Sequence, residues 1–426
     1  MNHSETNKNR RTLIIAVAFF IAAATCQMFS MVKSSFLSVF SAEVSVSFLV
    51  MLAFIYGIFK FFRSESAMYT ASFISVILFA NWSQLMLHYT CNSDKTDDIL
   101  KKVINFMLYA AFSMLSICVI FMILDKIKRF RKLCLGIFSV VAVGMSMLVL
   151  IFSAKDSNTS TTASGFQPAI LIMFLMLYAF SGAMAGNNGI FAKFIYIALF
   201  WGMMIILFLK HESGIPVMTC AACMITYIFF NKSAKEPWFI IFNIAVAVIG
   251  FAAIIIASPA IRKDIIVKFS TRVDDNEHWR IAEANLQASS LFGSESYDVC
   301  LNEASSDYAL NVNVHYFGYI WLALMMLSFF IMSISIYRDV LSNSNDNIIS
   351  NLRKLAYIAI CVNVIYNISD NICGAPVVGV QMIGCGISRS IALLTGLLIG
   401  SVIADSQKMK LSIVSFLEKT GVITAA

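Results

Sequence analysis

Residues 190–230 read IFAKFIYIALFWGMMIILFL, then KHES, then GIPVMTCAACMITYIFF. A bilayer core about 30 Å thick needs roughly 20 apolar residues for each helix that crosses it. The two apolar runs have about this length, and only a short polar break separates them. They are therefore predicted to be consecutive transmembrane helices joined by a tight turn, which makes lipid the main solvent of this part of the chain.

The same pattern recurs along the whole chain of 426 residues. Hydrophobic residues make up 59% of it and charged residues only 13%, which excludes a soluble surface wrapped around a single core. The sequence predicts an all-α polytopic membrane protein with about twelve transmembrane helices. They are expected near residues 12–32, 44–62, 68–88, 103–124, 133–153, 167–186, 190–209, 214–230, 238–258, 314–336, 355–370 and 382–403.

The distribution of Lys and Arg predicts how the chain is oriented, because basic residues in short loops stay on the cytoplasmic side. The segment 125–132 contains five of them and the link 337–354 three more, namely Lys126, Lys128, Arg129, Arg131, Lys132, Arg338, Arg353 and Lys354. Twelve spans place both segments inside, together with the N-terminal basic cluster and a tail over 405–426. Both termini are thus expected in the cytoplasm, and the net charge of +7 indicates topology rather than nucleic-acid binding.

This orientation sends the longest hydrophilic stretch, residues 259–313, to the external face as one large loop. A long loop on a protein with otherwise short loops is more often functional than passive. Within it, residues 277–292 have the pattern of an amphipathic helix suited to the membrane interface. The chain is accordingly divided into N-terminal spans (1–160), middle spans (161–258), the external loop (259–313), C-terminal spans (314–404) and the tail (405–426).

Few residues carry recognisable chemistry. The sequence has no Gly-rich phosphate loop, paired-His metal motif or Ser nucleophile elbow. Cys220 and Cys223 have the spacing of a redox or zinc pair, but small residues at this spacing inside a span usually pack helices, so no metal site is predicted. Ionisable groups near span ends are costly in lipid and are better candidates for function. They are His211, Glu212, His315, Asp370 and Arg389.

Five short stretches, in order, make the chain resemble the SEDS family (shape, elongation, division and sporulation proteins). They are Phe166-Gln167-Pro168, His211-Glu212-Ser213-Gly214, Ala288-Ser289-Ser290-Leu291-Phe292-Gly293, Ser306-Asp307-Tyr308 with Gly318 eleven residues after the acid, and Asn367-Ile368 followed by Pro376 and Gly379. Several family positions differ. His315 and Tyr316 replace two Glu, Ile281 and Ala282 replace Gln-Ser, and Ala169-Ile170 replaces Ser-Glu.

The resemblance implies a fold related to GT-C glycosyltransferases, with a core of ten spans to which this chain adds two. It implies a membrane glycosyltransferase that polymerises lipid II into peptidoglycan strands on the outer face of the bacterial cytoplasmic membrane, beside a class B penicillin-binding protein. Asp307 matches the family's essential aspartate and would be the general base for the acceptor hydroxyl. Arg262, Lys263, Lys268 and Arg280 would neutralise the diphosphate leaving group, and Glu212 and Gln167 fall on further motif positions.

Other interpretations stay open. Asp307 has the alternative role of an ordinary helix-capping acid, and the basic residues that of lipid-headgroup contacts. The sequence does not identify a cofactor, and a divalent cation is one candidate. The alternative functions are another polyprenyl-linked sugar polymerase or ligase of the O-antigen kind, a lipid-linked sugar flippase, and a non-catalytic scaffold for division or elongation.

Overall fold

The computed structural model describes residues 3–33, 42–61, 64–91, 101, 104–114, 116–117, 130–152, 168–186, 188–210, 214–230, 277–294, 308–342, 347–374, 382 and 389–403, with a few single positions between 245 and 259. Every regular element in these ranges is a helix. They are α1 (His3–Lys33), α2 (Ala42–Phe61), α3 (Glu65–Cys91), α5 (Phe130–Phe152), α6 (Pro168–Met184), α7 (Ile190–Leu209), α8 (Gly214–Phe230), α11 (Glu277–Gln287), α12 (Ala309–Ser342), α13 (Ile348–Cys373) and α14 (Arg389–Ile403). Residues 104–114 form a further helical segment.

The chain has the helices of a membrane protein. Four stretches, Arg10–Val32, Ile190–Leu209, Ala309–Val340 and Ile348–Cys373, are long and apolar enough to cross a bilayer, and six shorter apolar helices accompany them within the described ranges. The predicted helices at 190–209 and 214–230 coincide with α7 and α8. The predicted run at 238–258 lies almost wholly outside the described residues, so the count of about twelve spans stays a prediction.

Several helix boundaries differ from the sequence-based expectation. α12 begins at Ala309 rather than near residue 314, α13 covers 348–373 rather than 355–370, and α14 begins at Arg389 rather than near 382. Polar caps explain the extra length of α13. The Asn347 side chain accepts a hydrogen bond from Ser350 N at 2.8 Å, and Gly374 ends the helix in the left-handed region with φ 69°. Hydropathy alone does not register such caps.

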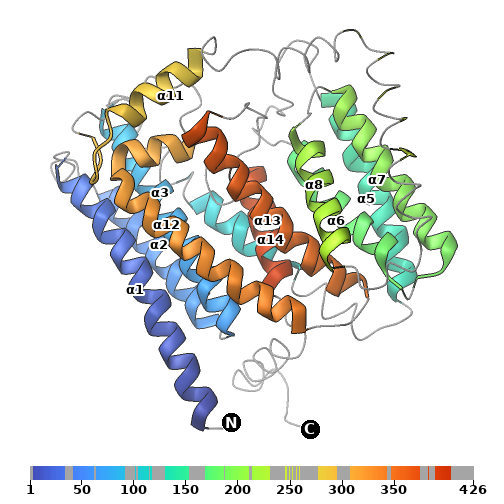
Figure 1. Cartoon of the computed structure of the whole chain (residues 1–426), viewed down its shortest axis with the longest axis horizontal. Helices are drawn as coiled ribbons and strands as arrows, with labels where there is room; N and C mark the ends of the chain where they lie inside the picture. Colours follow the sequence, from blue (N-terminus) through green and yellow to red (C-terminus); the bar gives the residue numbers. More distant parts are fainter. Residues whose placement is uncertain are drawn as a thin grey trace.

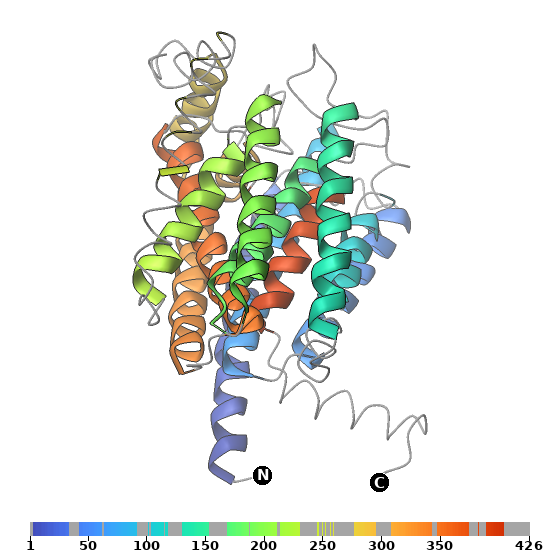
Figure 2. The ribbon, with the colours of Figure 1, turned by 90° about the vertical axis from the view of Figure 1, so that its right-hand side faces the viewer.

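The helices form one bundle with α13 and α14 near its middle (Figure 1). On one side α1, α3 and α12 pack together, with α2 against α3. On the other side α6 packs against α5, α7 and α8, while α13 contacts α6, α8, α12 and α14. α11 lies across one end, far from the start of α1, as the turned view in Figure 2 also shows. We call this the α11 end of the bundle.

Two glycines set how closely α14 approaches the segment 104–117. A Cβ on Gly396 would overlap Ala110 O and Ser113 Oγ, and a Cβ on Gly400 would overlap Ile117. Glycines four residues apart let two helix backbones approach closely, and in lipid such packing is a main source of helix association. The Gly396–Gly400 pair therefore holds α14 against the 104–117 segment.

We predict that Gly396→Leu disrupts this contact. Overpacking a tight interface costs about 1–3 kcal/mol and sometimes more. The apparent Tm in detergent, measured by fluorescence-detected size-exclusion chromatography, is expected to fall by about 1–3 °C. Gly144→Leu is the matched control, since nothing lies within 4 Å of a Cβ at that position. Equal stability of the two variants would contradict the assignment.

Candidate functional site

α11 is a two-sided helix that packs on α12 and α13. Ala282 and Leu286 are buried, whereas Glu283 and Gln287 are exposed and share a hydrogen bond of 3.2 Å. The predicted amphipathic pattern is therefore confirmed over 277–287. The helix ends earlier than expected, and residues 288–294 form a turn instead. Its apolar side faces protein in this structure, so α11 acts as a cap over the end of the bundle.

The turn after α11 is locked to α12 through two glycines. Gly293 (φ 93°) and Gly318 (φ 85°) both have left-handed backbone conformations, and Gly318 kinks α12. A Cβ on Gly293 would overlap Tyr316 O, and a Cβ on Gly318 would overlap Gly293 N and Leu291 O. Only glycine fits either conformation at low cost. Gly293 and Gly318 belong to two separate sequence motifs and meet backbone to backbone in the structure.

Backbone hydrogen bonds complete this lock. Ser294 N donates to His315 O at 2.8 Å, Ile320 N to Leu291 O at 3.1 Å, and Tyr319 N to Ser290 O at 3.3 Å. The kink at Gly318 frees the amides after it from the helical ladder, and the turn supplies their acceptors. α12 therefore consists of a short segment, 309–317, and a long one, 319–342, with the 288–294 turn bonded at the joint.

Beneath α11 lies a buried polar cluster made of Asn285, Asn311, His315 and Asn371. Asn311 is its centre: its side-chain Nδ2 donates to Ala282 O and to Asn371 O, each at 3.0 Å. The backbone N of Asn311 donates to Asn371 Oδ1 at 3.1 Å. One asparagine thereby joins α11, the short segment of α12 and the end of α13. All of these groups are shielded from solvent.

His315 is fixed by the same cluster. Its Nδ1 lies 2.9 Å from Asn285 O. A carbonyl oxygen only accepts hydrogen bonds, so Nδ1 carries a proton in this contact, and in a neutral ring Nε2 keeps the lone pair. His315 stands where the SEDS motif has a Glu, and here it ties α12 to the carbonyl of an α11 residue.

Further buried polar groups continue from the cluster along α13. Asn363, Asn367, Asp370 and Asn371 are all buried, and Asn367 Nδ2 donates to Asn363 O at 2.9 Å. Their spacing of three to four residues places them on one side of the helix. Buried ionisable and amide groups inside an apolar span are expensive and commonly mark function. Asp370, a candidate from the sequence, therefore lies beside the cluster.

Most of the other predicted site residues lie outside the described residues. These are Gln167, His211, Glu212, Arg262, Lys263, Lys268 and Asp307. Arg280 is described and occupies the exposed side of α11. Tyr308, the residue after Asp307, is buried, and α12 starts directly after it. Arg389 begins α14, with its guanidinium carbon 5.8 Å from the centre of the Tyr109 ring.

The sequence reasoning missed Asn285, Asn311 and Asn371. The available signal was amide side chains recurring at helical spacing, as at Asn363, Asn367 and Asn371. An amide carries no charge, so a search for costly ionisable groups does not detect it. The donors and acceptors of the cluster bond to one another and to backbone carbonyls, so the cluster holds α11, α12 and α13 together. The described residues hold no group of three His, Cys, Asp or Glu able to bind a metal ion.

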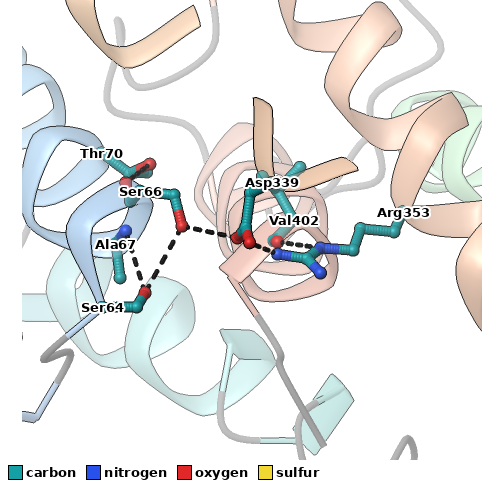
Figure 3. Close-up of polar contacts among 7 residues, drawn as sticks. All are labelled: Ser64, Ser66, Ala67, Thr70, Asp339, Arg353 and Val402. Carbon is teal, nitrogen blue, oxygen red and sulfur yellow. Dashed lines mark hydrogen bonds and ion pairs between the residues drawn. The ribbon is translucent and has the colours of Figure 1, made fainter. Parts of the chain in front are cut away.

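A second polar centre lies at the opposite end of α12 (Figure 3). Arg353 Nη2 pairs with Asp339 Oδ2 at 2.6 Å, and Arg353 Nε donates to Val402 O at 2.7 Å. Ser66 Oγ donates to the same Asp339 oxygen at 2.8 Å. One ion pair thus connects α3, α12, α13 and α14. The sequence places Arg353 in the link 337–354 between two spans, and this is wrong: Arg353 is a buried residue of α13.

This second centre has the character of a structural tie. The Arg353 side chain is 7% exposed and the Asp339 side chain 29%. The charges neutralise each other, and the guanidinium also stabilises the last carbonyls of α14 at the negative end of its dipole. The α11 end, in contrast, exposes the predicted site residue Arg280, which makes that end the better candidate for ligand binding.

No family model matches the chain, and no curated protein matches it either. A solved chain from work on the structural coordination of polymerization and crosslinking by a peptidoglycan synthase complex is similar in fold. The TM-score is 0.56 and the identity 12%, over 78% of this chain and 97% of that chain. The present chain therefore shares the fold of nearly the whole of that chain.

We predict that Asn311→Leu loosens α11. The substitution removes the Nδ2 donor of Ala282 O and Asn371 O and the Oδ1 acceptor of Asn285 Nδ2. Each buried group left unsatisfied costs about 1–3 kcal/mol. Hydrogen–deuterium exchange over residues 277–294 is expected to rise strongly. Glu283→Gln, on the exposed side of the same helix, should leave exchange unchanged. Similar exchange in both variants would argue against the central role of Asn311.

We also predict strong coupling between Asp339 and Arg353. Asp339→Asn leaves the buried guanidinium without its counter-ion, which costs about 3 kcal/mol, at the low end for buried pairs because Asp339 keeps some access to solvent. The double variant Asp339→Asn with Arg353→Met should recover much of the lost thermal stability in detergent. Additive losses in the double-mutant cycle would show that the pair is not an energetic unit.

Proposed function

We propose that this chain is a membrane glycosyltransferase that polymerises lipid II into glycan strands on the outer face of the cytoplasmic membrane, together with a class B penicillin-binding protein. The observation that carries the proposal is the fold, which is similar to a chain of a peptidoglycan synthase complex over 97% of that chain. The motif residues add support. Gly293 and Gly318 meet in the lock, and Asn367 belongs to the buried polar row.

The proposed general base is Asp307. In this proposal its carboxylate accepts the proton of the acceptor sugar hydroxyl as that oxygen attacks the anomeric carbon, and the lipid diphosphate leaves. A general base needs a fixed position relative to its substrate. Tyr308 and Ala309, which follow Asp307 in the chain, are buried, and Asn311 anchors the same helical segment to α11 and α13. This anchoring supports a base at the start of α12.

The proposed partners of the diphosphate are Arg262, Lys263, Lys268 and Arg280, with Glu212 and Gln167 as further substrate contacts. Cations stabilise the charge that develops on a leaving diphosphate. Arg280 is the one whose surroundings are described, and its place on the exposed side of α11 leaves it accessible to a ligand headgroup. A lipid-linked substrate suits this location, because its tail stays in the bilayer while the sugars reach water.

A non-catalytic scaffold is the second candidate, and a specific observation favours it. His315 and Tyr316 occupy positions where the SEDS motif has two acids, and both are buried in packing contacts here. Tyr316 O accepts a hydrogen bond from Ser30 Oγ on α1. A chain that has replaced acidic motif residues with packing residues retains the ability to hold partners in the membrane.

Glycan polymerisation from purified lipid II tests the proposal. The detergent-solubilised protein is assayed with its class B partner, comparing wild type, Asp307→Asn and the loop control Asp298→Asn. Loss of the base is expected to lower the rate by about 100-fold or more. The control should polymerise at the wild-type rate.

The outcomes separate the alternatives. Polymer formation that survives Asp307→Asn would remove this residue from the role of base. If wild type makes no polymer with any class B partner yet binds one stably, the scaffold is favoured. Activity on another polyprenyl-linked sugar, but not on lipid II, would indicate the O-antigen kind of polymerase or ligase.

A further inference from the structure

Two large apolar side chains stand out at the tip of the turn after α11. Leu291 is 62% exposed and Phe292 is 47% exposed. The turn is held by its backbone: Leu291 O accepts from Ile320 N at 3.1 Å, and the following Gly293 packs on Gly318. The two side chains are therefore presented outward by a fixed scaffold. Residues 288–294 also contain no charged side chain, which is unusual for an aqueous loop.

The tip touches the end of α1. The Phe292 ring centroid lies 5.7 Å from that of Phe29, with the rings tilted by 60°. Phe29 is itself 57% exposed, and Val32, one turn further along α1, is exposed as well. Phe29, Val32, Leu291 and Phe292 therefore form one continuous apolar surface, which we call the tip patch.

The tip patch continues a face that runs the length of α1. Ile14, Ile21, Met28 and Phe29 are exposed at spacings of about one or two helical turns. Thr25 lies on the same face, and its hydroxyl donates to Ile21 O at 2.8 Å. A face of large apolar groups, with its one hydroxyl satisfied inside the helix, is what contact with hydrocarbon requires. α1 is also one of the stretches long and apolar enough to cross a bilayer.

The depth of the tip patch in the membrane follows from helix geometry. Arg10 and Arg11 precede the apolar part of α1 and set one membrane boundary. At 1.5 Å per residue, Phe29 lies about 27 Å from Arg11, close to the roughly 30 Å thickness of the hydrocarbon core. Phe29 and the Phe292 ring against it are thus at the opposite boundary of the hydrocarbon core.

We propose that Leu291 and Phe292 insert into the boundary of the bilayer and anchor the turn after α11 to a lipid surface. The occupant of the tip patch is lipid, because the patch is uncharged, lies at membrane depth and extends a lipid-facing helix face without a break. The anchor holds α11 and the buried polar cluster at the membrane surface through the Gly293–Gly318 lock. This inference does not depend on the proposed enzymatic activity.

Site-specific photocrosslinking tests the anchor. The full-length protein carries p-benzoylphenylalanine in place of Leu291 or of Phe292 and is reconstituted in nanodiscs of phosphatidylethanolamine and phosphatidylglycerol. Mass spectrometry then measures lipid adducts after irradiation. Ile21, exposed on the lipid face of α1, is the positive control position, and Ala284, exposed on α11, is the solvent control. Both test positions are exposed, so each variant is expected to fold.

Lipid adducts at positions 291 and 292 are expected to approach those at Ile21 and to exceed those at Ala284 by about ten-fold, since acyl chains are confined to the core and its boundary. Adduct yields equal to those at Ala284 would overturn the proposal. Adducts to a second polypeptide chain in place of lipid would also overturn it, and would assign the tip patch to a protein partner or a second copy of the chain.

Discussion

The contact between Gly293 and Gly318 is the constraint on which the α11 end of the bundle depends. The two backbones approach so closely that a Cβ on either residue would overlap backbone atoms of the facing segment. Gly318 breaks α12 into two segments, and the amides released by the kink are satisfied by carbonyls of the turn after α11. The direction of the short α12 segment, the position of α11 and the exposure of Leu291 and Phe292 all follow from this joint.

The two ends of α12 are secured by different chemistry. At the α11 end, neutral amides and one imidazole share hydrogen bonds among α11, α12 and α13. At the other end, a buried ion pair joins α12 and α13, and hydrogen bonds extend the connection to α3 and α14. Hydrocarbon offers no hydrogen-bond partners to polar groups. A polar side chain inside the bundle therefore stabilises the packing of helices in which it meets a protein partner. At both ends the polar groups named here bond helices to one another, and the α11 end in addition exposes Arg280 on α11.

The fold similarity and the departures from the SEDS motifs have a common physical basis. Architecture depends on where helices are apolar and where glycines permit close approach, and both features tolerate wide changes in sequence. Low identity with a shared fold is therefore expected. Catalysis depends on individual side chains, so a shared helical frame does not require the same residues at positions such as those of His315 and Tyr316. Both residues are buried and contribute contacts that the acids would not make at low cost.

The sequence by itself determined the solvent of the chain, the positions of most apolar helices and the two-sided character of α11, because these depend on local composition and periodicity. Helix ends were less well predicted, since caps such as Asn347 and Gly374 act through single polar contacts or backbone angles. The buried polar cluster, the meeting of Gly293 with Gly318 and the burial of Arg353 were decided only by the tertiary structure. Asn285, Asn311 and Asn371 are far apart in the chain, and no local pattern tells which amide will face which carbonyl once the helices pack.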